Sequence, residues 1–354
     1  MRSSYSDKDV TILLKDITGM VEPLPANVRE KYIQSGKHYC EMLPLEYKPG
    51  EEYFRLYKES LERYASETGN AAACVAEKIK RKTEGPIVLV SLARAGTPAG
   101  IIIKRYLNRK YPDTEVYHYT ISIIRGKGID HNAMRYILKR HSAQSLCFVD
   151  GWTGKGAILD TLKSELSRYP GVSDELAVLA DPANITNLCG TKSDFLIPSS
   201  CLNSTVSGLL SRTFLRDDII GKDDFHGAAY YEELEKEDLS AEFINTVMNA
   251  IDFDKDYSLL PESKDECTCT GIDEVRLIQK DFGISDINFI KPGIGETTRV
   301  LLRRIPWKIL VNDMNDTDYL AHIFRLANEK NVEVIQYPMK CYRACGIIKK
   351  LADT

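Results

Sequence analysis

The segment Phe148–Gly156 combines residue types that can hold a phosphate group. An apolar run ends in Asp150, and Thr153, Gly154 and Gly156 follow before a helical pattern begins. A helix that starts there leaves backbone N–H groups unpaired and directed at a ligand, while the glycines allow close approach and Thr153 adds a hydroxyl donor. The segment therefore predicts a phosphate cradle. It is not a Walker A loop, because the G-x4-G-K-[ST] spacing is absent.

Two other loops carry basic side chains that can stabilise negative charge. Arg94 lies in the small-residue turn Ala93–Gly96, and Arg125 and Lys127 lie in a loop broken by glycines. Guanidinium and ammonium groups next to Mg²⁺ can stabilise a pyrophosphate that departs from a sugar. These loops extend the predicted phosphate site, although a solvated loop charge is an equally good interpretation of Arg125 and Lys127.

A cluster of hydroxyl groups around a guanidinium lies further along, where Arg212 is flanked by Ser211 and Thr213. Such a cluster can bind a phosphate or a base, and a structural salt bridge is the alternative role for Arg212. The surrounding segment 181–216 has little regular periodicity, and a loop of that length in a compact domain usually has a function. We therefore expect Arg212 to contact a ligand.

Cysteine chemistry is a separate hypothesis. A cysteine protease needs a thiolate and a nearby histidine that acts as its base. Cys189 or Cys201 is the candidate nucleophile with His38 as the base, although nothing in the spacing requires this pairing. Such cysteines are more commonly buried thiols, or loop thiols without a catalytic role. The nine cysteines are odd in number and scattered, which favours reduced thiols and no metal site.

Composition argues against several classes of protein. The 354 residues carry a net charge of −4, which disfavours a protein that coats nucleic acid. No apolar run reaches the roughly 20 residues of a membrane span, and the polar N-terminus lacks the apolar stretch of a secretory signal. A cytoplasmic protein without a membrane partner is therefore expected.

The elements that must position the loops alternate between strands and helices. Short apolar runs predict the strands, which are Ile87–Val90, Glu115–Ile124, Ser145–Val149 and Glu175–Leu179. The alternation predicts a mostly parallel sheet with helices on both faces, and ligands bind at the carboxyl ends of such strands. Before residue 85, helical patterns predict an N-terminal cap, at Glu51–Arg63 and Asn70–Lys82.

An acidic stretch separates this unit from the C-terminal part. Residues 230–269 hold twelve acids against three bases and predict one helix, Tyr231–Ile251, and a linker, 252–266. The following pattern predicts a small α-β-α domain. Its expected elements are a helix after residue 293, a strand at Trp307–Asn312, a helix at Asp318–Lys330 and a strand at Val332–Tyr337.

The three loops resemble, in the same order, those of type I phosphoribosyltransferases. The resemblance implies that phosphoribosyl pyrophosphate (PRPP) binds with Mg²⁺ and that Asp150, Arg125 and Lys127 are catalytic. One departure is Gly151, which stands where the family usually has a second acid. The resemblance also implies a set of substrate-binding residues: Ala93, Arg94, Ala95, Gly96, Gly151, Trp152, Thr153, Gly154, Lys155, Gly156 and Arg212.

The C-terminal segment resembles the Pelota and kink-turn-binding ribosomal protein superfamily, through a Gly-x-x-Glu-x-Thr-Arg turn that begins at Gly293. The resemblance also implies a last helix after Val334. In that superfamily the turn and the start of the next helix lie at the surface and contact RNA. Gly295 stands where kink-turn binders place an asparagine that reads a base, so sequence-specific kink-turn binding is not expected. A partner-binding or dimerising module is the alternative. The implied RNA-binding residues are Gly293, Gly295, Glu296, Thr298 and Arg299.

A wider resemblance covers about residues 10–225. The motif REKYIQSGKHY, the Cys189-Gly190-Thr191 triplet and the segment 207–213 are similar to the StiP family of tellurite-resistance and stress-response gene clusters. That family is labelled a cysteine protease and is also described as phosphoribosyltransferase-like. The main hypothesis is a transferase that binds PRPP or a nucleotide in a stress pathway. A StiP-type cysteine protease and a non-catalytic nucleotide sensor that controls RNA binding are the alternatives.

The chain is thus expected to have four parts. Residues 1–84 form an arm and helical cap, 85–229 a phosphoribosyltransferase-like domain, 230–269 an acidic helix and linker, and 270–354 a Pelota-like RNA-binding domain. The fold class is α/β, with a mostly parallel sheet of the type I phosphoribosyltransferase kind. The family resemblance also implies a homodimer.

Overall fold

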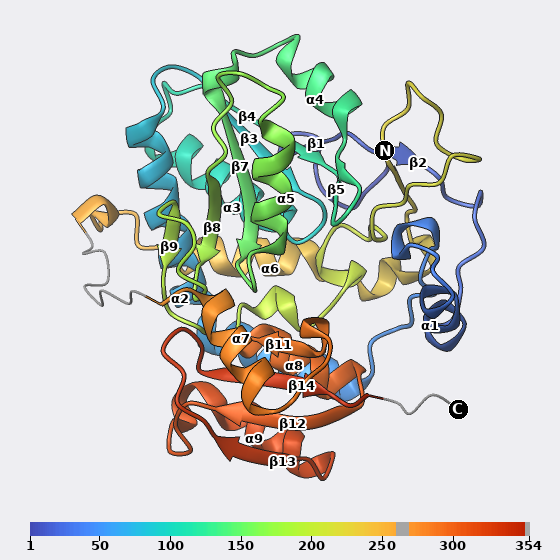
Figure 1. The fold of residues 1–354 in the computed structure, drawn as a ribbon. Helices are drawn as coiled ribbons and strands as arrows, with labels where there is room; N and C mark the ends of the chain where they lie inside the picture. Colours follow the sequence, from blue (N-terminus) through green and yellow to red (C-terminus); the bar gives the residue numbers. More distant parts are fainter. Residues whose placement is uncertain (260–268, 351–354) are drawn as a thin grey trace.

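The computed structural model describes residues 1–259 and 269–350. A sheet of six strands, all parallel, forms the centre of the N-terminal part (Figure 1), in the order β1-β4-β3-β7-β8-β9. The predicted mostly parallel sheet is confirmed, and its strands are β1 (Thr11–Ile12), β3 (Ile87–Leu92), β4 (Val116–Ile121), β7 (Leu146–Trp152), β8 (Leu176–Ala180) and β9 (Cys189–Thr191).

Helices cover both faces of this sheet because its central strands are apolar on both sides. In β3, Ile87 and Leu89 join one buried cluster, while Val88 and Val90 join another on the opposite face. Successive side chains of a strand point to opposite faces, so one apolar run serves both clusters. The first face carries α2 (Glu51–Lys82), α3 (Gly96–Lys110) and α6 (Ser240–Asn249), and the second carries α4 (His131–Leu138) and α5 (Ala157–Leu166).

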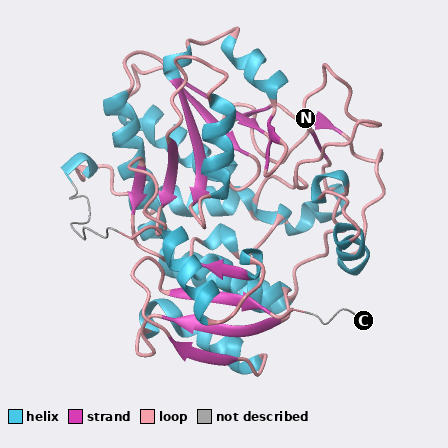
Figure 2. Ribbon diagram, in the orientation of Figure 1, coloured by secondary structure: helices cyan, strands magenta, loops and turns pink. Residues whose placement is uncertain are grey.

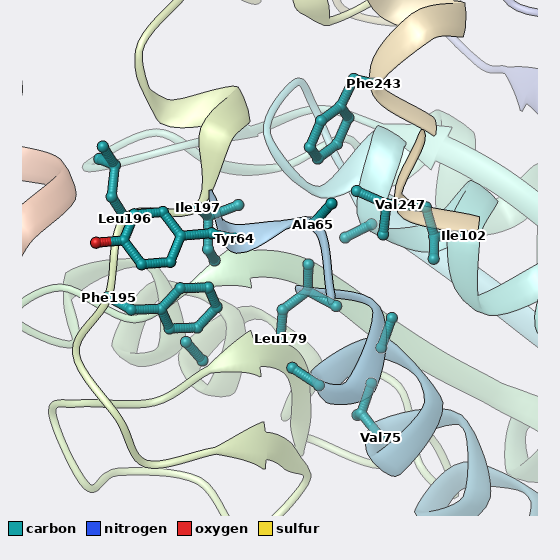
Figure 3. Packing of buried hydrophobic residues seen from close by; sticks show 14 of the residues in the cluster. Tyr64, Ala65, Val75, Ile102, Leu179, Phe195, Leu196, Ile197, Phe243 and Val247 are labelled. Carbon is teal, nitrogen blue, oxygen red and sulfur yellow. The ribbon is translucent and has the colours of Figure 1, made fainter. Parts of the chain in front are cut away.

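The two helices predicted in the cap are one helix, α2, of 32 residues. The pattern is interrupted at Gly69, which does not end the helix. A Cβ at Gly69 would lie 2.8 Å from the Ile251 side chain and 3.0 Å from the Val247 carbonyl oxygen. The glycine therefore serves a close approach of α6, whose Phe243 and Val247 pack beside α2 (Figure 3).

The helix predicted at Tyr231–Ile251 is interrupted. A 3₁₀-helix at Glu232–Glu237 precedes α6, and between them the Asp238 carboxylate accepts the backbone N–H of Ser240, the first residue of α6, at 3.0 Å. The predicted linker, 252–266, lies partly outside the described residues. The smaller elements are α1 (Ala26–Gln34), the pair β2 (Lys15–Asp16) and β10 (Gly227–Ala228), and the hairpin β5 (Ile123–Ile124) and β6 (Gly128–Ile129).

The C-terminal part is a four-stranded sheet with helices on both faces (Figure 2). The order is β11-β14-β12-β13, with only the β12–β13 pair parallel. The last helix predicted here is wrong, because that segment is the buried strand β14; short apolar runs do not distinguish the two structures. The elements are α7 (Gly271–Asp281), β11 (Ile290–Pro292), α8 (Ile294–Arg303), β12 (Pro306–Val311), α9 (Thr317–Glu329), β13 (Glu333–Gln336) and β14 (Ala344–Ile348).

The two parts share one buried apolar cluster. Tyr64 of α2 packs with Phe195 and Ile197 of the N-terminal part (Figure 3), and the same cluster includes Leu301 of α8 and Ile323 of α9. The second sheet is thereby held against α2 and the segment after β9. Among residues 1–259 and 269–350, no helix combines the length and the apolar character needed to cross a bilayer.

Candidate functional site

The predicted phosphate cradle lies at the carboxyl end of β7, where its polar groups form hydrogen bonds with other groups of the chain. Asp150 accepts the backbone N–H of Gly151 at 2.8 Å, and burial raises the pKa of its carboxyl group to about 7. The Thr153 hydroxyl donates to the buried Asp181 carboxylate at 2.6 Å. The hydroxyl donor expected to face a phosphate is therefore directed to an internal acid.

The C-terminal part covers the rest of this loop. The Lys155 ammonium group donates to the Ile287 carbonyl oxygen at 2.7 Å, and the Gly154 carbonyl oxygen accepts the Tyr342 hydroxyl at 2.9 Å. Gly156 adopts a left-handed φ of +97° at the start of α5. The outer side of the predicted cradle is thus a contact between the two parts of the chain.

The second predicted loop joins β3 to α3 and contains Ala93, Arg94 and Ala95. Gly96, the first residue of α3, lies so close to β7 that a Cβ would be 2.4 Å from the Val149 carbonyl oxygen. The Arg94 guanidinium donates to the Leu210 carbonyl oxygen at 2.7 Å. The loop thus binds the segment that contains Arg212, and the sequence correctly places these predicted residues at one edge of the sheet.

The predicted basic loop is the tip of the β5–β6 hairpin. Lys127 is exposed there. Arg125 contacts both parts of the chain, because its guanidinium donates to the Asn288 side chain at 3.0 Å and its backbone N–H donates to the Tyr39 hydroxyl at 3.1 Å. In addition, the Arg125 carbonyl oxygen lies 3.1 Å from Nε2 of His38.

The five residues predicted to bind RNA do not form a free surface. Gly293 and Thr298 are buried, and the backbone N–H of Ile294 donates to the buried Asp194 carboxylate at 2.9 Å. The expectation that the whole turn lies at the surface is wrong, because it packs on the loops that follow β8 and β9. Gly295 serves this contact, since a Cβ there would meet the Ser200 hydroxyl at 3.3 Å.

Glu296 and Arg299, the charged members of this turn, are partly exposed and bind each other. Their side chains form an ion pair at 2.8 Å, and the Nε–H group of Arg299 donates to the Ser200 carbonyl oxygen at 3.0 Å. The Arg299 guanidinium also lies over the Trp152 ring, 5.0 Å from its centre. Trp152, assigned to the substrate site, therefore contacts the predicted RNA-binding turn.

The two cysteines proposed as nucleophiles lie in the interior. Cys189 is 3% exposed at the start of β9, and Cys201 is 0% exposed with its sulfur 3.8 Å from the Ser60 hydroxyl. Burial raises the pKa of the Cys201 thiol to about 11. His38, the base proposed for them, contacts a different cysteine.

That cysteine is Cys40, whose Sγ lies 3.0 Å from Nδ1 of His38. Gly36, with a left-handed φ of +94°, ends α1, and His38 then caps a short 3₁₀-helix that contains Cys40. With its proton on Nε2, the imidazole donates to the Arg125 carbonyl oxygen, and Nδ1 accepts the backbone N–H of Cys40 at 3.4 Å while it faces the thiol. Burial, followed by the negative Glu41, raises the pKa of the Cys40 thiol to about 11. The sequence prediction paired His38 with the distant Cys189 or Cys201, whereas the structure brings it to Cys40 through the His-x-Cys spacing.

One further group of side chains has the donor atoms of a metal site. Ligand atoms of Cys269, Glu274 and Cys341 all lie within 4.8 Å of one another. The Glu274 carboxylate already accepts backbone N–H groups, including that of Lys340 at 2.5 Å and that of Tyr342 at 3.3 Å. The carboxylate therefore has a structural role at the start of β14, whether or not a metal binds.

The fold and the site define the class of this protein, a parallel α/β domain joined to a Pelota-type domain. Residues 3–248 match the family described as tellurite-like stress resistance cysteine protease StiP, and residues 269–350 match the PELOTA RNA binding domain. The chain belongs to the StiP family. It is also 34% identical over 366 residues to a protein of Acinetobacter baylyi named cysteine protease StiP, with 98% of this chain and 94% of the relative covered.

These matches correct the main hypothesis from the sequence. The prediction of a PRPP- or nucleotide-binding transferase is wrong, because the family and the relative are both named as a cysteine protease. The contacts of Thr153 and Lys155 give a physical reason, since both donors of the predicted cradle are bound to groups of this chain. The resemblance to the StiP family and to Pelota domains is confirmed.

Proposed function

We propose that this protein is a cysteine peptidase in which Cys40 is the nucleophile and His38 is the general base. The observation that carries the proposal is the 3.0 Å contact between Nδ1 of His38 and Sγ of Cys40. The Arg125 carbonyl oxygen orients the ring, as the third group does in other thiol–imidazole sites. The imidazole can then accept the thiol proton as sulfur attacks a peptide carbonyl carbon, and return it to the leaving amine.

In this structure the nucleophile is in a resting state. The Cys40 side chain is 0% exposed, and its thiol faces the Leu215 carbonyl oxygen at 3.7 Å. The raised pKa means that the thiol is protonated at neutral pH, so the base must act during the attack. Catalysis then requires residues 213–216 to move away from the sulfur.

The test is proteolysis of labelled casein by the full chain and by single-cysteine variants. Cys40→Ala should lower turnover at least about 10³-fold, as expected for removal of a nucleophile. Cys189→Ala and Cys201→Ala are matched controls and should remain within a few-fold of the parent chain. Circular dichroism and the thermal midpoint of each variant report whether it is folded.

Two results would overturn the proposal. One is a folded Cys40→Ala variant that digests casein as the parent chain does. The other is loss of activity in Cys201→Ala or Cys189→Ala while Cys40→Ala remains active, which would return the role to the cysteines named from the sequence. A parent chain without thiol-dependent proteolysis also counts against it.

Narrower expectations from the sequence stay predictions. They are the type I phosphoribosyltransferase form of the fold, the four domain boundaries, the cytoplasmic location and the homodimer. The Mg²⁺ prediction was tied to the transferase, and no observation tests it.

A further inference from the structure

Three side chains at the start of the C-terminal part carry donor atoms of the kinds that bind zinc. Cys269 precedes α7, Glu274 lies in the first turn of that helix, and Cys341 lies in the loop before β14. A sulfur or carboxylate oxygen of each lies within 4.8 Å of those of the other two. The two cysteines are 72 residues apart, so no local spacing in the sequence indicated this group.

The spacing of the three donor atoms suits one ion. Because no two of them are more than 4.8 Å apart, some point lies within about 2.8 Å of all three, whereas Zn–S and Zn–O bonds are about 2.3 Å and about 2.0–2.2 Å long. Each donor atom therefore needs to approach by less than about 1 Å, which a small side-chain rotation supplies. Cys269 is only partly buried, so an ion can reach the group from solvent.

The carboxylate of the group is fixed in position and carries a charge in the interior. Glu274 is 4% exposed, and the partners of its oxygens in residues 1–259 and 269–350 are backbone N–H groups, those of Lys340, Cys341 and Tyr342. These hydrogen bonds hold the carboxylate beside the loop that carries Cys341. Backbone dipoles satisfy the oxygens without supplying a full positive charge, and buried carboxylates are usually paired with a cation or bound to a metal.

The two thiols lie against the same stretch of backbone. Sγ of Cys341 donates to the Cys269 carbonyl oxygen at 3.4 Å, and Sγ of Cys269 donates to the Thr270 carbonyl oxygen at 3.5 Å. An S–H group is a weak donor. Each thiol therefore loses little when it gives its proton to solvent and binds a metal as the thiolate.

We propose that Cys269, Glu274 and Cys341 bind one Zn²⁺ ion. Zinc is the ion that fits, because it accepts both soft thiolates and a hard carboxylate in a tetrahedral arrangement. On binding, the two thiols release their protons to solvent and each sulfur forms a bond to the ion, while a carboxylate oxygen is the third ligand. A water molecule completes the four-coordinate set, as is usual where a protein supplies three ligands.

The ion stabilises the joint between the two parts of the chain. Two residues after Cys269, the backbone N–H of Gly271 donates to the Ala183 carbonyl oxygen at 2.8 Å. Tyr342, which follows Cys341, donates its hydroxyl to a carbonyl oxygen of the loop after β7 at 2.9 Å. Both cysteine ligands thus flank contacts with the N-terminal part, so the zinc supports docking of the C-terminal part and is separate from the proposed peptidase site.

The experiment titrates Zn²⁺ into the full chain, after reduction with a phosphine and removal of metals, with a chromophoric zinc indicator as the competitor. The parent chain should bind one ion. Cys269→Ala and Cys341→Ala should each weaken binding at least about 100-fold because each removes one of three ligands, and Glu274→Gln should weaken it about tenfold. Cys74→Ala, which removes a buried thiol in α2, is the matched control and should bind as the parent does.

Two further measurements report on the ligands and on the fold. Co²⁺ in place of Zn²⁺ should give the near-ultraviolet charge-transfer absorption of cobalt–thiolate bonds, and Cys269→Ala and Cys341→Ala should lose it. Saturating zinc should raise the thermal midpoint of the parent chain by about 3 °C or more, and that of these two variants much less. Circular dichroism before metal is added reports whether each variant is folded.

The proposal fails if the reduced parent chain binds no zinc, if Cys269→Ala and Cys341→Ala bind as the parent does, or if Cys74→Ala loses binding equally. If the reduced chain binds no zinc and the two thiols oxidise to a disulfide in air, the pair serves redox chemistry instead. Cys40→Ala should bind zinc as the parent does, and loss of binding in that variant would move the site to the thiol beside His38. The zinc result and the peptidase result can therefore fail separately.

Discussion

Cys40 and Cys201 are two buried thiols with the same raised pKa of about 11 and different surroundings. Cys201 lies within the apolar cluster that both parts of the chain share, beside the Ser60 hydroxyl. Cys40 lies outside the buried apolar clusters, with an imidazole at 3.0 Å. The thiol pKa therefore does not distinguish the two cysteines. They differ in whether a group that can accept the thiol proton lies beside the sulfur.

Replacement of His38, the group that can accept the thiol proton of Cys40, should have the largest effect of the changes considered. His38→Asn leaves the Cys40 thiol without a base, so peptidase turnover should fall about 10²–10⁴-fold, the usual contribution of general-base catalysis. The pH dependence should also steepen, because only preformed thiolate would then react. Kinetics with casein across pH 6–10 would measure both. His141→Asn, a histidine bound to Tyr119 on another face, is the control.

The rates of chemical labelling should also distinguish Cys40 from Cys201, by a smaller factor than the change in turnover expected for His38→Asn. Both should react slowly with iodoacetamide at pH 8 and about tenfold faster per pH unit until the pH approaches 11, because only the thiolate reacts. Low concentrations of urea should accelerate labelling of Cys201, whose exposure requires the shared core to open. Labelling of Cys40 should depend little on urea. Mass spectrometry of the digested protein measures each site, and equal urea dependence would remove the distinction.

The smallest expected effect concerns the charge next to Cys40. Glu41 is the second cause of the raised thiol pKa after burial, so Glu41→Gln should lower that pKa slightly. The labelling rate of Cys40 at fixed pH should rise about two- to threefold, while that of Cys201 stays constant. Glu41→Asp keeps the charge and should behave as the parent does. A change at Cys201 of the same size would point to a general loosening of the fold.

The sequence was sufficient for the elements that local patterns determine. Strands β3, β7 and β8 were predicted because each is a short apolar run bounded by glycine or polar residues, and the loops that follow them were placed at one edge. The segment that is β14 was expected to be a helix only because the family resemblance implied one, and its side chains instead form a buried strand. The StiP and Pelota resemblances required several motifs in order, and they were correct.

What the sequence did not reveal depends on contacts between distant segments. Gly69 lies in the gap between the two helices that were predicted in the cap, and only the approach of Ile251 explains why a glycine stands there. Gly295 looked like a lost base-reading position, and the structure shows that it accommodates Ser200. The burial of the RNA-binding turn follows from docking of one part on the other, which no local pattern encodes. The His38–Cys40 contact was detectable, because only one residue separates them in the sequence.

Helix α2 joins the two parts through its side chains. The Tyr64 ring stacks on Tyr319 with 6.0 Å between centres, Glu59 pairs with Arg325 at 2.9 Å, and the Tyr53 hydroxyl binds the Leu302 carbonyl oxygen. Without the C-terminal part, the side of α2 that carries Tyr53 and Tyr64 would lie in water, so the N-terminal part expressed alone is expected to aggregate.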